Sequence, residues 1–335
     1  MEEEHYEEQI DFNEVIDALL DSATTFPAKY ISRLSGLEDL ELEQLSETWP
    51  LITPLRRQRL LEDMEALTDN SFIVDFDEVF KLGLGDENPH IRVTAIRGLW
   101  ENDDRSIATR LLEILQHDPD TDVCAQAASG LGKFIYLGEL RELDKNLYNR
   151  IIQLMIEIIN GDGPEIVRRR ATESLGFSSH HQAPALIETA YNKQKEDWLV
   201  SALIAMGRSA NHQWIPQIIE NLSHEDSLIR LEAAQSAGLL GAQETVSHLL
   251  QMIDDPEEDV KLAAIWALSE VGGLDARAAL EGLIRNSRDE NEIEFLEDAL
   301  ENIDFNEVNI DFHLLEISPD DERELEDDDG WDEED

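Results

Sequence analysis

Segments of similar sequence recur along this chain at a nearly constant interval. Seven of them align on the first position of a short apolar pattern, at Ile91, Val123, Val167, Trp198, Ile229, Val260 and, in the last and weakest segment, Glu292. Five of the six intervals are 31 or 32 residues long, and one is 44. A fixed period of this length predicts a protein built from stacked repeats, in which each unit is covered only by its neighbours.

Each of the first six repeats places three apolar residues on one helical stripe. Four residues after the start position stands an alanine, at Ala95, Ala127, Ala171, Ala202, Ala233 and Ala264, and eight residues after it stand Leu99, Leu131, Leu175, Met206, Ala237 and Leu268. Offsets 0, 4 and 8 share one face of an α-helix, and a small middle residue lets a neighbouring helix approach closely. Another helical pattern precedes each stripe, at residues 104–116, 147–160, 183–192, 214–222, 245–253 and 276–285. The sequence therefore predicts antiparallel helix pairs.

The pattern D-P-x-x-x-V-R-x-x-A-A-x-x-L-G is clearest at residues 118–132, 162–176 and 255–268. It resembles the HEAT-repeat family, in the short form known from phycobilisome-lyase-type repeats. The resemblance implies an all-α fold, an α-solenoid wound as a right-handed superhelix, over about residues 75–302, and it implies little about function. Basic residues one position after the start, at Arg92, Arg168, Arg230 and Lys261, resemble the aspartate-to-arginine ladder of HEAT proteins, so Arg168 is expected to be structural.

The parts outside the regular repeats also yield expectations. Residues 10–74 are expected to hold degenerate helices or a cap, with helices at 37–48 and 54–67, and residues 303–318 to cap the C-terminal end. The interval of 44 residues contains an insertion at about 136–148, which lengthens either a loop or the next helix. The acidic ends, residues 1–9 and 319–335, are expected to be disordered, because they contain too little apolar surface to form a core.

The hexapeptide IDFNEV occurs at residues 10–15 and again at 303–308, with the near copy VDFDEV at 74–79. As a helix start it makes Asp11 an N-cap that accepts from the amide at N3, while Glu14 reaches back to the cap amide. The same roles are expected for Asp75 and Asp304. A binding motif displayed at both ends remains the alternative, supported by the related segment at 309–318.

The net charge of −50, from 76 acidic and 26 basic residues, limits the classes of partner. Nucleic acids and anionic membranes bind through lysine and arginine, so neither is expected as a partner. The acidity serves either solubility or the steering of a protein with a basic surface. A single cysteine, Cys124, excludes disulfides within the chain, and no secretory or membrane-spanning pattern occurs. We expect a cytoplasmic, monomeric protein.

Enzymatic signatures are weak in this sequence. The resemblance to deoxyhypusine hydroxylase within the HEAT family would require several His-Glu pairs for two irons, and here His224-Glu225 is the single such pair. His180-His181 stands in a loop without an evident third metal ligand. We expect no catalytic residues, no metal and no cofactor. A maturation helper related to the phycobilin lyases remains the alternative.

Residues opposite the buried stripe are the candidate partner-binding positions. Offsets 2 and 6 hold apolar side chains toward the C-terminal end, at Val200, Ile204, Leu231, Leu262 and Trp266. The resemblance places this side in the concave groove of a HEAT superhelix, where exposed apolar residues indicate a docking patch. A helix phase wrong by one residue would place them in the core instead. Arg169 and Arg170 form a basic spot at the groove offsets, expected to receive carboxylates from a partner or from the chain's own tail. The sequence thus predicts a non-enzymatic scaffold or adaptor.

Overall fold

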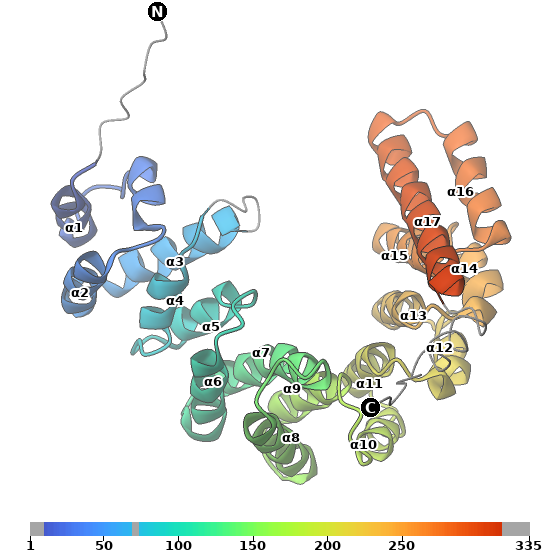
Figure 1. Ribbon diagram of the computed structural model, residues 1–335, viewed down its shortest axis with the longest axis horizontal. Helices are drawn as coiled ribbons and strands as arrows, with labels where there is room; N and C mark the ends of the chain where they lie inside the picture. The colour runs from blue at the N-terminus through green and yellow to red at the C-terminus, as the bar shows by residue number, and fades with distance from the viewer. Residues whose placement is uncertain (1–9, 69–73, 317–335) are drawn as a thin grey trace, which may run out of the picture. The chain divides into compact units, whose positions relative to one another are not determined.

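The computed structural model describes residues 10–68 and 74–316, and these residues form helices and turns with no β-strand. The chain divides into two compact units, residues 1–186 and 187–335, called here the N-terminal and C-terminal units. Figure 1 labels the helices in chain order. The predicted all-α repeat fold is confirmed. The acidic ends at 1–9 and 319–335 lie outside the described residues.

The N-terminal unit contains short helices followed by longer pairs. Its α-helices are α1 (Phe12–Leu20), α2 (Asp39–Thr48), α3 (Pro54–Thr68), α4 (Asp77–Gly83), α5 (Pro89–Gly98), α6 (Arg105–His117), α7 (Thr121–Glu139), α8 (Lys145–Asn160) and α9 (Glu165–Leu175). Three 3-10 turns, η1 (Ala28–Tyr30), η2 (Ser32–Leu34) and η3 (Trp49–Leu51), connect the first of these. The boundary between the units falls within α10 (Ala183–Tyr191).

The C-terminal unit repeats the helix pair more regularly. It contains α11 (Glu196–Arg208), η4 (His212–Trp214), α12 (Ile215–Asn221), α13 (Ser227–Leu239), η5 (Gln243–Thr245), α14 (Val246–Met252), α15 (Glu258–Val271), α16 (Leu274–Asn286) and α17 (Glu290–Glu316). Among the described helices none combines the length and apolarity needed to cross a membrane.

The second helix of each pair packs against the second helix of the next pair. In the N-terminal unit α3, α5, α7 and α9 form one such series, and in the C-terminal unit α11, α13, α15 and α17 form another. The predicted stripe lies in these contacts: all six alanines at offset 4 are fully buried, and the start positions from Ile91 to Val260 are buried as well. Small side chains at the middle of each stripe allow this close packing.

The residue predicted to start the last repeat is exposed rather than buried. Glu292 is exposed in the first turn of α17, and the buried positions of that helix are Leu296, Ala299 and Ile303. An acidic residue is favourable at a helix N-terminus, where it faces the positive end of the helix dipole. The spacing itself is kept, because Leu296 follows the buried Ala264 by the same 32 residues that separate Glu292 from Val260.

The insertion lengthens helices and leaves a short connection. Helix α7 has 19 residues and α8 has 16, and they are joined by residues 140–144. Tyr148 lies against Gly138, where an added Cβ would fall 2.1 Å from the tyrosine ring. The Tyr148 hydroxyl donates to Glu139 at 2.5 Å, and burial together with this carboxylate raises the pKa of Tyr148 to about 12. Glu139 also accepts from the Ser179 amide at 2.7 Å, which ties the end of α7 to the segment after α9.

The three copies of the capping motif have different outcomes. Asp11 caps α1, but it accepts from the Asn13 amide at N2, and the Glu14 carboxylate instead accepts from the Tyr30 hydroxyl at 3.4 Å. Asp75 accepts from the Asp77 amide at 3.0 Å just before α4 begins. The prediction for Asp304 is wrong, because α17 runs unbroken through residues 303–316, with no Gly or Pro to end it, and Asp304 pairs with Arg277.

Candidate functional site

The five predicted docking residues lie on three helices of the C-terminal unit that pack in series. Val200 and Ile204 are on α11, Leu231 is on α13, and Leu262 and Trp266 are on α15. Leu262 is 39% exposed, and the other four are half-buried. None is fully buried, although Val200, Leu231 and Trp266 also pack against the core. The helix phase therefore leaves part of each side chain accessible.

A glycine on α13 positions Trp266. A Cβ added at Gly238 would lie 2.7 Å from the Trp266 ring and 3.0 Å from the Ala267 backbone. The indole therefore rests on α13, with one part packed and one part accessible. Ser269 donates to the Trp266 carbonyl at 2.8 Å, and Asn302 of α17 donates to the Ser269 hydroxyl at 3.3 Å. These contacts hold α15 in register with both neighbours.

Sequence reasoning missed the two most exposed apolar residues of this surface. Leu228 is 64% exposed and Leu239 is 55% exposed, and both are on α13. Leu228, Leu231, Gln235 and Leu239 follow one another at intervals of 3, 4 and 4 residues, which places them on one face of the helix. Extending the stripe by one turn in each direction would have found them. We define the apolar docking face as the side chains of Val200, Ile204, Leu228, Leu231, Leu239, Leu262 and Trp266.

Acidic side chains stand at the edges of the docking face. Asp197 lies one turn before Val200 on α11, and Asp259 lies one turn before Leu262 on α15. Glu258 also stands at the start of α15, where its carboxylate accepts from Lys261 at 3.0 Å. An apolar centre with a charged rim is the usual composition of a protein-binding surface.

Two of the four predicted ladder positions, Arg92 and Arg230, form ion pairs between successive repeats. Arg92 donates to both carboxylate oxygens of Asp118 at 2.8 and 2.7 Å, and Arg230 donates to both of Asp255 at 2.8 Å. The Arg230 hydrogen bonds hold the pKa of Asp255 below its usual range. A further rung, Arg57 to Asp86 at 3.2 Å, lies before the repeats that the sequence revealed.

A family model for HEAT repeats matches residues 78–176, 183–269 and 215–301 of the sequence. These ranges include the Arg92–Asp118 and Arg230–Asp255 pairs and the six buried stripes described above. The chain belongs to the HEAT-repeat family. A comparison with curated protein sequences gave no match.

Solved structures with similar folds are other repeat proteins. The Escherichia coli protein YibA is 16% identical, with 73% of this chain and 95% of YibA covered and a TM-score of 0.42. A designed armadillo repeat protein is 16% identical, covering 58% of this chain and 98% of its own, with a TM-score of 0.38. Human deoxyhypusine hydroxylase in complex with glycerol is 16% identical, with 78% of this chain and 95% of the hydroxylase chain covered and a TM-score of 0.34. These similarities carry no information about binding or activity.

The predicted basic spot belongs to the N-terminal unit of this HEAT protein, whereas the docking face belongs to the C-terminal unit. Arg170 on α9 pairs with Glu173 at 2.7 Å, and Glu173 is only 4% exposed. Arg170 therefore neutralises a buried carboxylate of its own helix. Arg168 donates to the Ile159 carbonyl at 3.0 and 3.2 Å, which caps the C-terminal end of α8. Arg169 is half-buried on the same helix.

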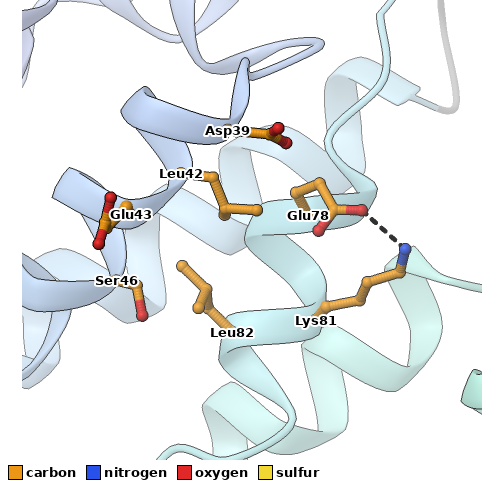
Figure 2. Close-up of a pocket in the computed structure, with 7 residues that line it drawn as sticks. All are labelled: Asp39, Leu42, Glu43, Ser46, Glu78, Lys81 and Leu82. Carbon is orange, nitrogen blue, oxygen red and sulfur yellow. Dashed lines mark hydrogen bonds and ion pairs between the residues drawn. The ribbon is translucent and has the colours of Figure 1, made fainter.

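A cleft of about 390 Å³ lies between α2 and α4 (Figure 2). It is lined by Asp39, Leu42, Glu43, Ser46, Glu78, Lys81 and Leu82. Leu42 and Leu82 face each other from the two helices, and the Lys81 ammonium pairs with Glu78 at 2.8 Å. With three carboxylates and one ammonium group, this cleft favours a cationic side chain over an anionic one.

The histidines singled out in the sequence make local contacts. His224 Nδ1 accepts from the Asp226 amide at 3.0 Å, and its carbonyl accepts from Arg230. The rings of His180 and His181 lie 4.3 Å apart between centroids, and burial followed by the neighbouring ring lowers the pKa of His180. Among residues 10–68 and 74–316, no group of three His, Cys, Asp or Glu side chains has a geometry suited to a metal ion.

Proposed function

We propose that this HEAT protein is a non-enzymatic scaffold or adaptor that binds a protein partner through the apolar docking face. The observation that carries the proposal is the stripe of leucines on α13, of which Leu228 and Leu239 are more than half exposed. Exposed apolar side chains gathered on neighbouring helices mark a protein-binding surface more often than isolated ones do. Trp266, partly exposed on a glycine, fits the role of an anchor residue.

The partner's chemistry follows from the surface it would meet. Apolar side chains on the partner would cover the leucines, while basic residues would pair with Asp259 at the edge. The net charge of −50 steers a basic protein toward this chain and repels nucleic acids and anionic lipids. We also propose that the chain is monomeric and cytoplasmic. Size-exclusion chromatography with light scattering tests the first property, and cell fractionation tests the second.

The decisive experiment compares capture of partners by matched variants in the native host. Leu228→Glu with Leu262→Glu charges the docking face at exposed positions, so the fold is expected to survive. Leu51→Glu with Leu274→Glu is the control, because these leucines are 70% and 83% exposed and lie outside the docking face. We expect a partner captured by the wild type and the control to be lost with the docking-face variant. Equal capture by all three would contradict the proposal.

The same purification addresses the alternative of a lyase-like maturation helper. An absorption spectrum of the captured material would show a visible band if a tetrapyrrole or a pigment protein were retained. We expect no such band, since no residue of the docking face has catalytic chemistry. A bound chromophore that survives gel filtration would instead favour the helper.

A further inference from the structure

One ladder arginine of each unit, Arg92 and Arg230, binds in the same way, through four hydrogen bonds each. Arg92 bonds both oxygens of Asp118, and its Nη1 donates to the carbonyls of Asp86 and Glu87 at 2.8 and 3.1 Å. Arg230 bonds both oxygens of Asp255, and its Nη1 donates to the carbonyls of His224 and Glu225 at 2.8 and 3.0 Å. Each guanidinium therefore joins the loop before its own helix to the aspartate of the following loop.

Helix α7 has a cysteine at this ladder position. Cys124 stands one residue after Val123, as Arg92 stands after Ile91, and its thiol contacts the Asp118 carbonyl at 3.4 Å. The equivalent of the following aspartate is Asp162, five residues before Val167. A ladder arginine is thus replaced by a short side chain, between two loops that retain the other parts of a rung.

A cavity of about 330 Å³ occupies this place. Its walls include the loop residues Asp118 and Pro119 on one side, Gly161 and Gly163 on the other, and Cys124 between them. Its volume is within the range of pockets that bind small groups. The cavity is therefore where the side chain of a ladder arginine would lie.

We propose that this cavity binds a guanidinium group, carried by an arginine side chain of a protein partner. By register, the carbonyls of Asp118 and Pro119 take the place of the carbonyls that accept from Arg92 Nη1. Asp162 is exposed and stands between the lining residues Gly161 and Gly163, and by register its carboxylate supplies the bidentate pair. Leu115, Ile158 and Val167 in the walls cover the methylene groups of the arginine.

The charges around the cavity are compatible with a guest cation. Burial, and then the carboxylates of Asp118 and Asp120, raise the pKa of the Cys124 thiol, so the thiol itself stays neutral. Arg168 also lines the cavity, but it is held by the Ile159 carbonyl. The existing ladder shows that two arginines can share one aspartate, since Asp86 pairs with Arg57 through its carboxylate and with Arg92 through its carbonyl.

The first test places an arginine at position 124 of the chain, where it can form the missing ion pair with Asp162. We expect Cys124→Arg to raise the melting temperature, and Asp162→Asn to remove that gain while changing the wild type little. Cys124→Met is the matched control, because it fills the cavity without a guanidinium and should show no dependence on Asp162. A Cys124→Arg protein whose melting temperature does not change when Asp162→Asn is added would overturn the proposed pairing.

The second test measures guest binding by saturation-transfer NMR with acetyl-Gly-Arg-Gly-amide, its lysine counterpart, and agmatine. We expect the arginine peptide to bind, the lysine peptide to bind severalfold more weakly because it cannot form a bidentate pair, and both signals to vanish in Cys124→Met. Binding of agmatine without the arginine peptide would assign the site to a free guanidino compound and overturn the protein partner. No binding by any of the three would overturn the proposal. Neither test involves the apolar docking face, so this site and the proposed scaffold function can fail separately.

Discussion

The two units differ in the side chains at equivalent positions of their second helices, which are mostly large and apolar in the C-terminal unit and mixed in the N-terminal unit. In the C-terminal unit, offsets 2 and 6 present Val200, Ile204, Leu231, Leu262 and Trp266. In the N-terminal unit the same offsets hold small or apolar residues (Val93, Ala125 and Ser129), the half-buried Arg169 and two members of ion pairs: Arg97 binds Glu65 at 2.6 Å, and the buried Glu173 accepts from Arg170 at 2.7 Å. Both units keep the same buried alanine at offset 4. The stacked repeat therefore constrains the buried stripe, while the opposite face is free to take either chemistry, and function follows from that choice.

The largest expected effect concerns the buried charges of the N-terminal unit. Asp86 has no exposed side-chain surface; it pairs with Arg57 and accepts from the Trp49 indole at 2.9 Å. Asp86→Ala would leave Arg57 buried without its counter-charge, which costs about 3–5 kcal/mol. Urea denaturation followed by circular dichroism should show the corresponding decrease in the free energy of unfolding.

The control for Asp86 is a surface ion pair of the same unit. Asp103 pairs with Lys133 at 2.5 Å but is 63% exposed. Asp103→Ala should cost less than about 1 kcal/mol. Equal losses in the two variants would show that burial does not distinguish the ladder from the surface pairs.

The next effect concerns the packing beneath the docking face. Gly238→Ala would press a methyl group against the Trp266 ring and the backbone of α15, with an expected cost of about 1–3 kcal/mol. The melting temperature and the tryptophan emission spectrum should both change. Gly163→Ala serves as the control, because a Cβ at Gly163 meets no atom within 4 Å. An unchanged stability in Gly238→Ala would mean that Trp266 is not seated on α13.

The third effect is the pH dependence of the ladder in the C-terminal unit. Because Arg230 lowers the pKa of folded Asp255, the pair stabilises the fold above the unfolded pKa, about 3.9, and its contribution is lost as pH falls through the lower folded value. We expect Arg230→Gln to be less stable than the wild type at pH 6, and the difference in melting temperature to shrink between pH 4 and pH 2. If the difference in melting temperature stayed constant between pH 4 and pH 2, the stability contributed by Arg230 would not depend on the ionisation of Asp255.

The sequence predicted the buried stripe and the helix pairs well, because a repeated three-residue pattern averages out the ambiguity of each copy. It failed at the start of the last repeat: Glu292 stands at the predicted start position but is exposed, although Leu296 at offset 4 is buried. It also failed at Asp304, since a local capping motif does not end a helix whose flanking residues favour continuation. The sequence could not predict the cavity beside Cys124. That cavity is recognised by comparing Cys124 with Arg92 and Arg230, whose hydrogen bonds show where an arginine side chain would lie.

The smallest expected effect tests whether the leucines of the docking face belong to the fold at all. Leu228→Ser and Leu239→Ser replace side chains that already contact water, so each should change the free energy of unfolding by no more than about 0.5 kcal/mol. Leu231→Ser, at a half-buried position of the same stripe, should cost more. Denaturation curves of the three variants separate the two roles. A loss above about 1 kcal/mol in Leu228→Ser would assign that leucine to the fold, and the contrast between the two units would then be one of packing rather than of binding.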